Sequence, residues 1–208
     1  MTIKDKVKLT VKYIKSLSDF KIIEPDIPYH HMGATITDAI LQAGITWETV
    51  VSPRVQRLRR DYPEAKTTTG FLKLLERIGP RELLRWNGPE KPNRILLVTR
   101  FFVKEGIETE ENLKVWLESE TNTTRLKKLR GIGNKTVDYF KMLSGIPTSA
   151  VDRHLIEFLK RAGVNTISYS EAREIINNVA EQMGINKSVL DHSIWKYMLS
   201  GTVRKLCT

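Results

Sequence analysis

The sequence predicts an all-α protein, and three observations lead to this class. Apolar residues recur at helical spacing in most segments of the 208-residue chain. Capping residues, glycines and prolines stand between these segments, where helices begin and end. The β-branched run at 95–99 is a candidate strand, but its flanking residues fit a helix better. The chain is long enough to bury a core, either as one domain or as two small ones.

Residues with strong positional preferences bound the expected helices. Pro25 and Pro28 prevent the first helix from continuing. Thr67–Thr69 are N-cap candidates, Pro80 suits a first turn, and Gly106 suits a helix end. Besides a pair of short helices within 126–140, the expected helices cover about 7–17, 36–43, 46–58, 70–78, 80–85, 94–105, 109–117, 152–162, 169–183 and 187–199.

The chain is strongly basic. It has 34 Lys and Arg residues against 24 Asp and Glu residues, a net charge of +10, and a pI of about 9.7. Such an excess favours a polyanionic partner, because neutralising phosphates releases condensed counterions. A second basic cluster, at Arg54, Arg57, Arg59 and Arg60, is either a solvated helix face or a track for phosphates.

Cysteine content and hydropathy exclude several classes of protein. The single cysteine, Cys207, cannot form a disulfide or a cysteine-rich metal site within one chain. No apolar run has the length of a membrane span, and the lysine-rich N-terminus does not resemble a secretory signal. We therefore expect a cytoplasmic, nucleoid-associated protein with no membrane contact and no metal.

The segment LKKLRGIGNKTVDYF, Leu126–Phe140, is typical of two short helices joined by a glycine hairpin. Gly131 and Gly133 allow backbone conformations closed to other residues and leave peptide N–H groups uncovered. These groups and the positive end of the following helix can hold a phosphate oxygen. The alternative is a plain helix connection with a glycine C-cap. The expected DNA-binding residues are Arg125, Lys127, Lys128, Arg130, Gly131, Ile132 and Gly133.

The motif LRGIGNKTVDYF, followed by AVDRHL, resembles the signature of the helix-hairpin-helix (HhH-GPD) DNA glycosylases, the superfamily of endonuclease III and the 8-oxoguanine glycosylases. The match is specific over Leu126–Leu155 and weaker over most of the chain. The resemblance implies a two-lobed all-α fold. A helical barrel would span 32–145 and contain the helix-hairpin-helix, and residues 1–31 and 146–208 would form the second lobe. It also implies a monomer.

The catalytic lysine of that superfamily falls on Lys135, and its catalytic aspartate falls on Asp152. The resemblance therefore implies base excision repair on double-stranded DNA that contains damaged bases or abasic sites. Lys135 would attack the sugar as a damaged, oxidised base leaves. It would then form a Schiff base whose β-elimination cuts the backbone. The positive helix end and partial burial both disfavour its ammonium form. Asp152 would stabilise charge on the sugar, and no cofactor is required.

Each assigned residue also has a structural alternative. Lys135 could be one more phosphate contact, and Asp152 suits the N-cap of the helix that follows it. Gln42 could line the lesion pocket, fill the gap in the DNA, or be an ordinary helix residue. His154 could line the pocket, although a hydrogen-bonded structural role suits it better.

The resemblance has one clear departure and leaves the substrate open. Endonuclease III carries a four-cysteine iron–sulfur loop after its last helix, whereas this chain offers only Cys207 there. Pocket residues come from several helices, so the lesion is not identified. A monofunctional glycosylase for a deaminated or mismatched base, and a non-catalytic DNA-binding protein, remain as alternatives.

Overall fold

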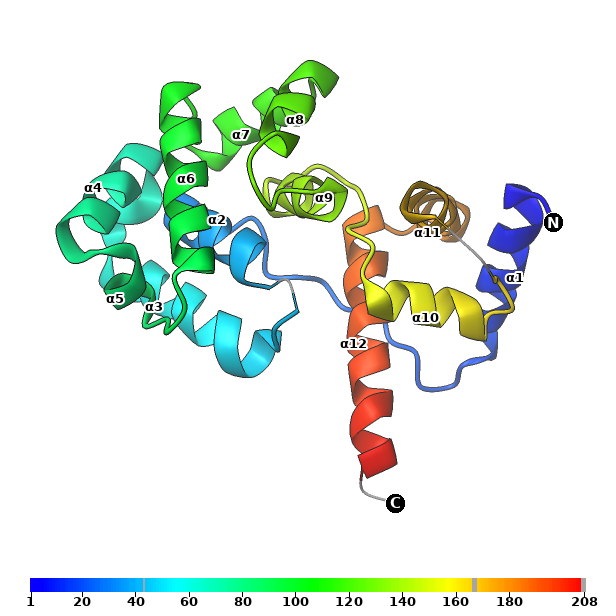
Figure 1. Cartoon of the computed structure of the whole chain (residues 1–208). Helices are drawn as coiled ribbons and strands as arrows, with labels where there is room; N and C mark the ends of the chain where they lie inside the picture. The colour runs from blue at the N-terminus through cyan, green and yellow to red at the C-terminus, as the bar shows by residue number, and fades with distance from the viewer. Residues whose placement is uncertain (43, 166–167, 207–208) are drawn as a thin grey trace. The chain divides into compact units, whose positions relative to one another are not determined.

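The computed structural model describes residues 1–42, 44–165 and 168–206, and their side chains except those of 201–206. These residues form helices and connections with no strand, which confirms the expected all-α class (Figure 1). Within the same ranges, every helix is too short or too polar to cross a bilayer. Cys207 lies outside the described residues. The chain divides into two compact units. We call Ile27–Ile146 the central unit, and Met1–Asp26 with Pro147–Thr208 the terminal unit.

The central unit is built around helix α2 (Met32–Leu41), all of whose residues are buried. The sequence MGATITDAIL is almost entirely small or apolar, so this helix can accept neighbours on every side. The elements that follow α2 are η1 (Trp47–Val51), α3 (Ser52–Asp61), η2 (Pro63–Lys66), α4 (Thr68–Ile78), α5 (Pro80–Leu84), α6 (Glu90–Lys104), α7 (Glu110–Leu117), α8 (Glu120–Lys127) and α9 (Asn134–Leu143).

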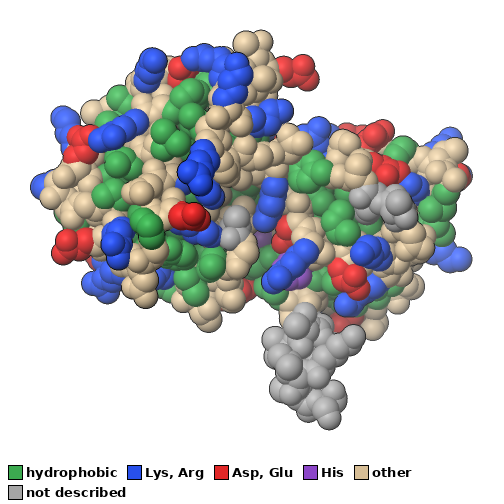
Figure 2. Space-filling view, viewed as in Figure 1, with side chains coloured by type: hydrophobic (Ala, Val, Ile, Leu, Met, Phe, Trp, Pro, Cys, Tyr) green, Lys and Arg blue, Asp and Glu red, His purple; other side chains and the backbone are tan. Residues whose placement is uncertain are grey.

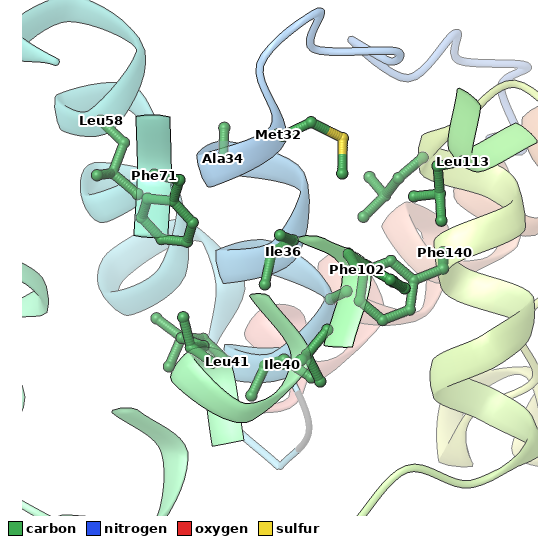
Figure 3. Close-up of a cluster of buried hydrophobic side chains, with 14 of the residues drawn as sticks. Met32, Ala34, Ile36, Ile40, Leu41, Leu58, Phe71, Phe102, Leu113 and Phe140 are labelled. Carbon is green, nitrogen blue, oxygen red and sulfur yellow. The ribbon is translucent and has the colours of Figure 1, made fainter. Parts of the chain in front are cut away.

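The core of the central unit lies on both sides of α2. In Figure 3, the side chains of α2 lie between Leu58 and Phe71 on one side and Phe102 and Phe140 on the other. The contact with α4 is close, because a Cβ at Gly33 would come within 2.8 Å of the Phe71 ring. Close packing therefore fixes the position of helix α2, and with it the positions of the residues at its C-terminal end.

The terminal unit has a core of its own. It contains α1 (Ile3–Ser16), α10 (Arg153–Arg161), α11 (Tyr169–Met183) and α12 (Lys187–Leu206), and α1 lies against α11 (Figure 1). An aromatic group in this core has ring centroids 5.2 to 6.0 Å apart, and it comprises Tyr13, Phe20, Phe158 and Tyr197. The first and last parts of the chain thus complete one hydrophobic core.

Helix boundaries follow the sequence where strong end signals exist. Helix α11 has the expected bounds, Tyr169–Met183. Helix α6 begins four residues earlier than expected, at Glu90, because Pro92 is tolerated in a first turn. The expected helix over 46–58 is instead a π-helical turn followed by α3. The last helix does not end at 199 but continues to Leu206.

Candidate functional site

The hairpin of residues 128–133 joins α8 to α9. Gly131 has φ +83°, in the left-handed region that a Cβ disfavours. A Cβ at this position would also lie 2.3 Å from the guanidinium group of Arg94. Ile132 is 5% exposed and its N–H donates to the carbonyl of Leu129 at 3.0 Å. The hairpin thus needs glycine at 131, and the buried Ile132 packs the hairpin against the core.

Gly133 has a different role from the one expected. Its backbone, at φ −112° and ψ −175°, is extended, and a Cβ there would meet no atom within 4 Å. The expectation of a conformation closed to other residues is therefore wrong for this position. Gly133 is the N-cap of α9, and among the described residues no side chain caps that helix. The first N–H groups of α9 are thus available to an anion.

The two glycines make a matched pair of variants. Gly131→Ala is expected to lower the free energy of unfolding by about 1–2 kcal/mol, because alanine is strained at positive φ. Gly133→Ala is expected to lower it by less, about 0.5 kcal/mol, because the backbone and the space accept a methyl group and the only cost is that alanine is a poorer N-cap than glycine. Urea denaturation of the full chain measures both values. Equal losses would contradict this description of the hairpin.

The basic side chains near the hairpin differ in their surroundings. Lys127, Lys128 and Arg130 are exposed. Arg125 forms an ion pair with Glu105 at the end of α6, so part of its charge is neutralised within the protein. In Figure 2, Lys and Arg side chains are scattered over the visible face, with Asp and Glu side chains between them. The expected DNA-binding lysines thus reach solvent, and Arg125, which is also exposed, is paired with Glu105.

Two members of the second basic cluster have an internal role, whereas Arg59 and Arg60 are exposed. Arg54 donates to the carbonyl oxygens of Leu84 and Arg85 at 2.7 and 2.8 Å, and Arg57 donates to the carbonyl of Leu83. These carbonyls lie at the C-terminal end of α5, where cations are favoured. Arg54 and Arg57 therefore cap α5, a role that neither sequence-based alternative included.

Lys135 lies in the first turn of α9 and is partly buried. Its Nζ donates to Oε1 of Gln42 at 3.2 Å. Gln42 is the C-cap of α2, so the lysine is held against the end of the central helix. The structure therefore brings together Lys135 and Gln42, which the sequence named for separate reasons.

Asp38, which the sequence analysis missed, lies beside this pair. Its carboxylate is buried and accepts hydrogen bonds from the hydroxyls of Tyr29 (2.8 Å) and Tyr139 (3.0 Å) and from the indole of Trp47 (3.1 Å). Burial raises the pKa of Asp38 to about 6, although these three donors and the charge of Lys135 act to lower it. The available signal was a lone charge within the apolar sequence of α2.

A second lysine, Lys91, was also missed. It lies in the first turn of α6, donates to the carbonyl of Leu41 and lies 5.6 Å from the centroid of the Trp86 ring. Burial and the positive charges of Arg94 and Lys135 lower the pKa of Lys91 to about 8. The end of α2 thus receives a lysine from each of two helices.

In the terminal unit, Asp152 is the N-cap of α10, as its position in the sequence predicts. Its Oδ1 accepts from the N–H groups of His154 at 2.7 Å and Leu155 at 3.1 Å. Its Oδ2 lies 2.9 Å from Nδ1 of His154. His154 is therefore a hydrogen-bonded partner of Asp152. Lys135 belongs to the central unit and Asp152 to the terminal unit.

The two adjacent histidines have separate surroundings. His31 is buried, and its Nδ1 accepts from the N–H of Ala34 at the start of α2. The side chain of His30 is 72% exposed beside Glu111. Among the residues that the structure describes, no three His, Cys, Asp or Glu side chains are grouped so as to hold a metal ion.

No curated protein and no solved structure matches the chain. One family model, described as Domain of unknown function (DUF8548), matches residues 8–199 and so covers most of both units. The chain therefore belongs to the DUF8548 family.

Proposed function

We propose that this protein is a DNA glycosylase with AP-lyase activity, of the helix-hairpin-helix kind. It removes a damaged, oxidised base from duplex DNA and then cuts the backbone at the abasic site. The family description assigns no activity, so the proposal rests on the hairpin of residues 128–133, on Lys135 and on Asp152.

The position of the Lys135 amine carries the proposal. Lys127 and Lys128 extend into solvent, as lysines that grip phosphates do. Lys135 is partly buried, and its Nζ is directed to Gln42 at the end of α2. A nucleophilic lysine needs a fixed and partly desolvated amine, whereas a phosphate contact does not. This placement favours the covalent role over the phosphate contact.

The hairpin supplies the grip on DNA. The exposed Lys127, Lys128 and Arg130 carry positive charge, and the first N–H groups of α9 are available to a phosphate oxygen. Such contacts hold the backbone without reading its sequence, which suits an enzyme that must find a lesion anywhere. The damaged nucleotide would then be flipped out of the helix.

The chemistry proceeds in two steps. The neutral Lys135 amine bonds to C1′ while the base leaves with the electron pair of the glycosidic bond. The amine loses a proton in this step, and the departing base gains one. The C1′–O4′ bond then breaks as the nitrogen forms a double bond to C1′, and O4′ takes up a proton. Loss of a C2′ proton then breaks the C3′–O bond, and the 3′ phosphate leaves by β-elimination. The Asp152 carboxylate stabilises positive charge on the sugar.

Borohydride trapping tests the proposal. Duplexes with an abasic site, 8-oxoguanine, an oxidised pyrimidine or uracil would be incubated with the full chain and reduced. We expect a covalent adduct with the abasic duplex and with at least one lesion duplex, and none with undamaged DNA. Base release without an adduct would indicate a monofunctional glycosylase. Binding without either product would leave a non-catalytic DNA-binding protein.

A further inference from the structure

Two hydrogen bonds join α2 to α9, one helical turn apart. The hydroxyl of Tyr139 donates to Asp38 at 3.0 Å, and the amine of Lys135 donates to Gln42 at 3.2 Å. In each helix the two residues are four positions apart and so share one face. Asp38, in the earlier turn of α2, pairs with the later turn of α9, so the helices run in opposite directions. The contact therefore places a carboxylate and an amine in adjoining turns.

The Asp38 carboxylate is held by neutral donors. Tyr29, Trp47 and Tyr139 occupy both of its oxygens, and none of them brings a positive charge. A buried carboxylate is costly without a compensating cation. The positive charge of Lys135, from α9, acts on Asp38 and lowers its pKa against the effect of burial. The amine of Lys91, in α6, donates a hydrogen bond to the carbonyl of Leu41 at the end of α2.

We propose that Asp38 is a positioning residue for Lys135, and that its buried carboxylate is the counter-ion that holds the lysine amine at the C-terminal end of α2. The importance of this pairing for catalysis rests on the proposed function, but the pairing itself does not. The ammonium group R–NH₃⁺ first loses a proton to solvent, because only the neutral amine has the lone pair that attacks the abasic aldehyde. The amine R–NH₂, the aldehyde and one proton then give the Schiff base R–NH⁺=CH– and water. The same carboxylate therefore opposes a positive charge before and after the reaction.

The pairing can be measured without DNA. The indole N–H of Trp47 donates to Asp38, so its NMR signal in the full chain should titrate with a midpoint near 6. Trp47→Phe assigns the signal, and Asp38→Asn should abolish the titration. Lys135→Met removes the facing positive charge, which lowers the pKa of Asp38, so the midpoint should rise. An unchanged midpoint in Lys135→Met would overturn the proposal.

Two further variants keep this experiment decisive. Lys141→Met removes a lysine from the last turn of the same helix and should leave the midpoint where it is. Tyr139→Phe keeps the aromatic ring and the Asp38 carboxyl but removes one hydrogen-bond donor, so it should raise the midpoint. If Asp38→Asn does not fold, the shift of the midpoint in Tyr139→Phe still shows that the Trp47 signal follows the titration of Asp38.

A second measurement connects the pairing to the reaction. The rate of borohydride-trapped adduct on abasic DNA would be measured from pH 5 to 9. Asp38→Asn removes the buried negative charge in the turn of α2 next to the lysine amine, so the rising limb of the rate profile should move to lower pH. An unchanged profile would overturn the role of Asp38. No adduct from the wild-type protein, with the NMR coupling intact, would overturn the proposed function and leave the pairing standing.

Discussion

Lys135→Ala is expected to abolish the borohydride-trapped adduct on abasic DNA, a loss of about 10³-fold or more. The reason is chemical, because the Schiff base forms on the lysine amine and alanine has no amine. The variant should fold, since Lys135 is only partly buried and its hydrogen bond is to the side chain of Gln42. Denaturing electrophoresis of the reduced products measures the adduct.

A matched control separates the amine from the general effect of losing positive charge. Lys141→Ala removes a lysine from the last turn of α9 and should leave the adduct at the wild-type level. The salt dependence of DNA binding gives a second comparison. If Lys135 were only a phosphate contact, its removal would reduce the slope of log K against log salt by about one and leave the adduct intact. That result would contradict the nucleophilic role.

The sequence predicted those features that depend on local rules. Helix α11 has its expected bounds because Ser168 caps its start and Gly184, in the left-handed conformation, ends it. Asp152 caps α10 for the same kind of reason. Gly131 has positive φ, as a tight connection between two helices requires. Each of these features involves residues within a few positions of one another.

Features that depend on distant partners were missed. Asp38 is held by Tyr29 and Trp47, each nine residues away, and by Tyr139, which is 101 residues away. Helical spacing shows that α2 is apolar, but it does not show which side chains turn toward a lone carboxylate. The internal role of Arg54 and Arg57 could not be predicted either, because their carbonyl partners belong to α5, far along the chain. Charge patterns do not reveal such internal contacts.

Asp152→Asn is expected to lower turnover by about 10²–10³-fold while leaving DNA affinity unchanged. The substitution removes the negative charge that would stabilise the cationic sugar. It preserves the cap, because asparagine is as good an N-cap as aspartate and can accept from the N–H groups of His154 and Leu155. Single-turnover base release on a lesion duplex and the dissociation constant for the same duplex measure the two effects.

Asp152→Ala completes the comparison, because it removes the cap as well as the charge. Its free energy of unfolding should fall by about 1 kcal/mol, whereas that of Asp152→Asn should stay close to the wild-type value. If the carboxylate acts in the reaction, both variants lose turnover and only alanine loses stability. If Asp152 is only a cap, the asparagine variant keeps full turnover. The alanine variant alone would then lose turnover, together with its stability, and this result would contradict the assignment of Asp152 to the sugar.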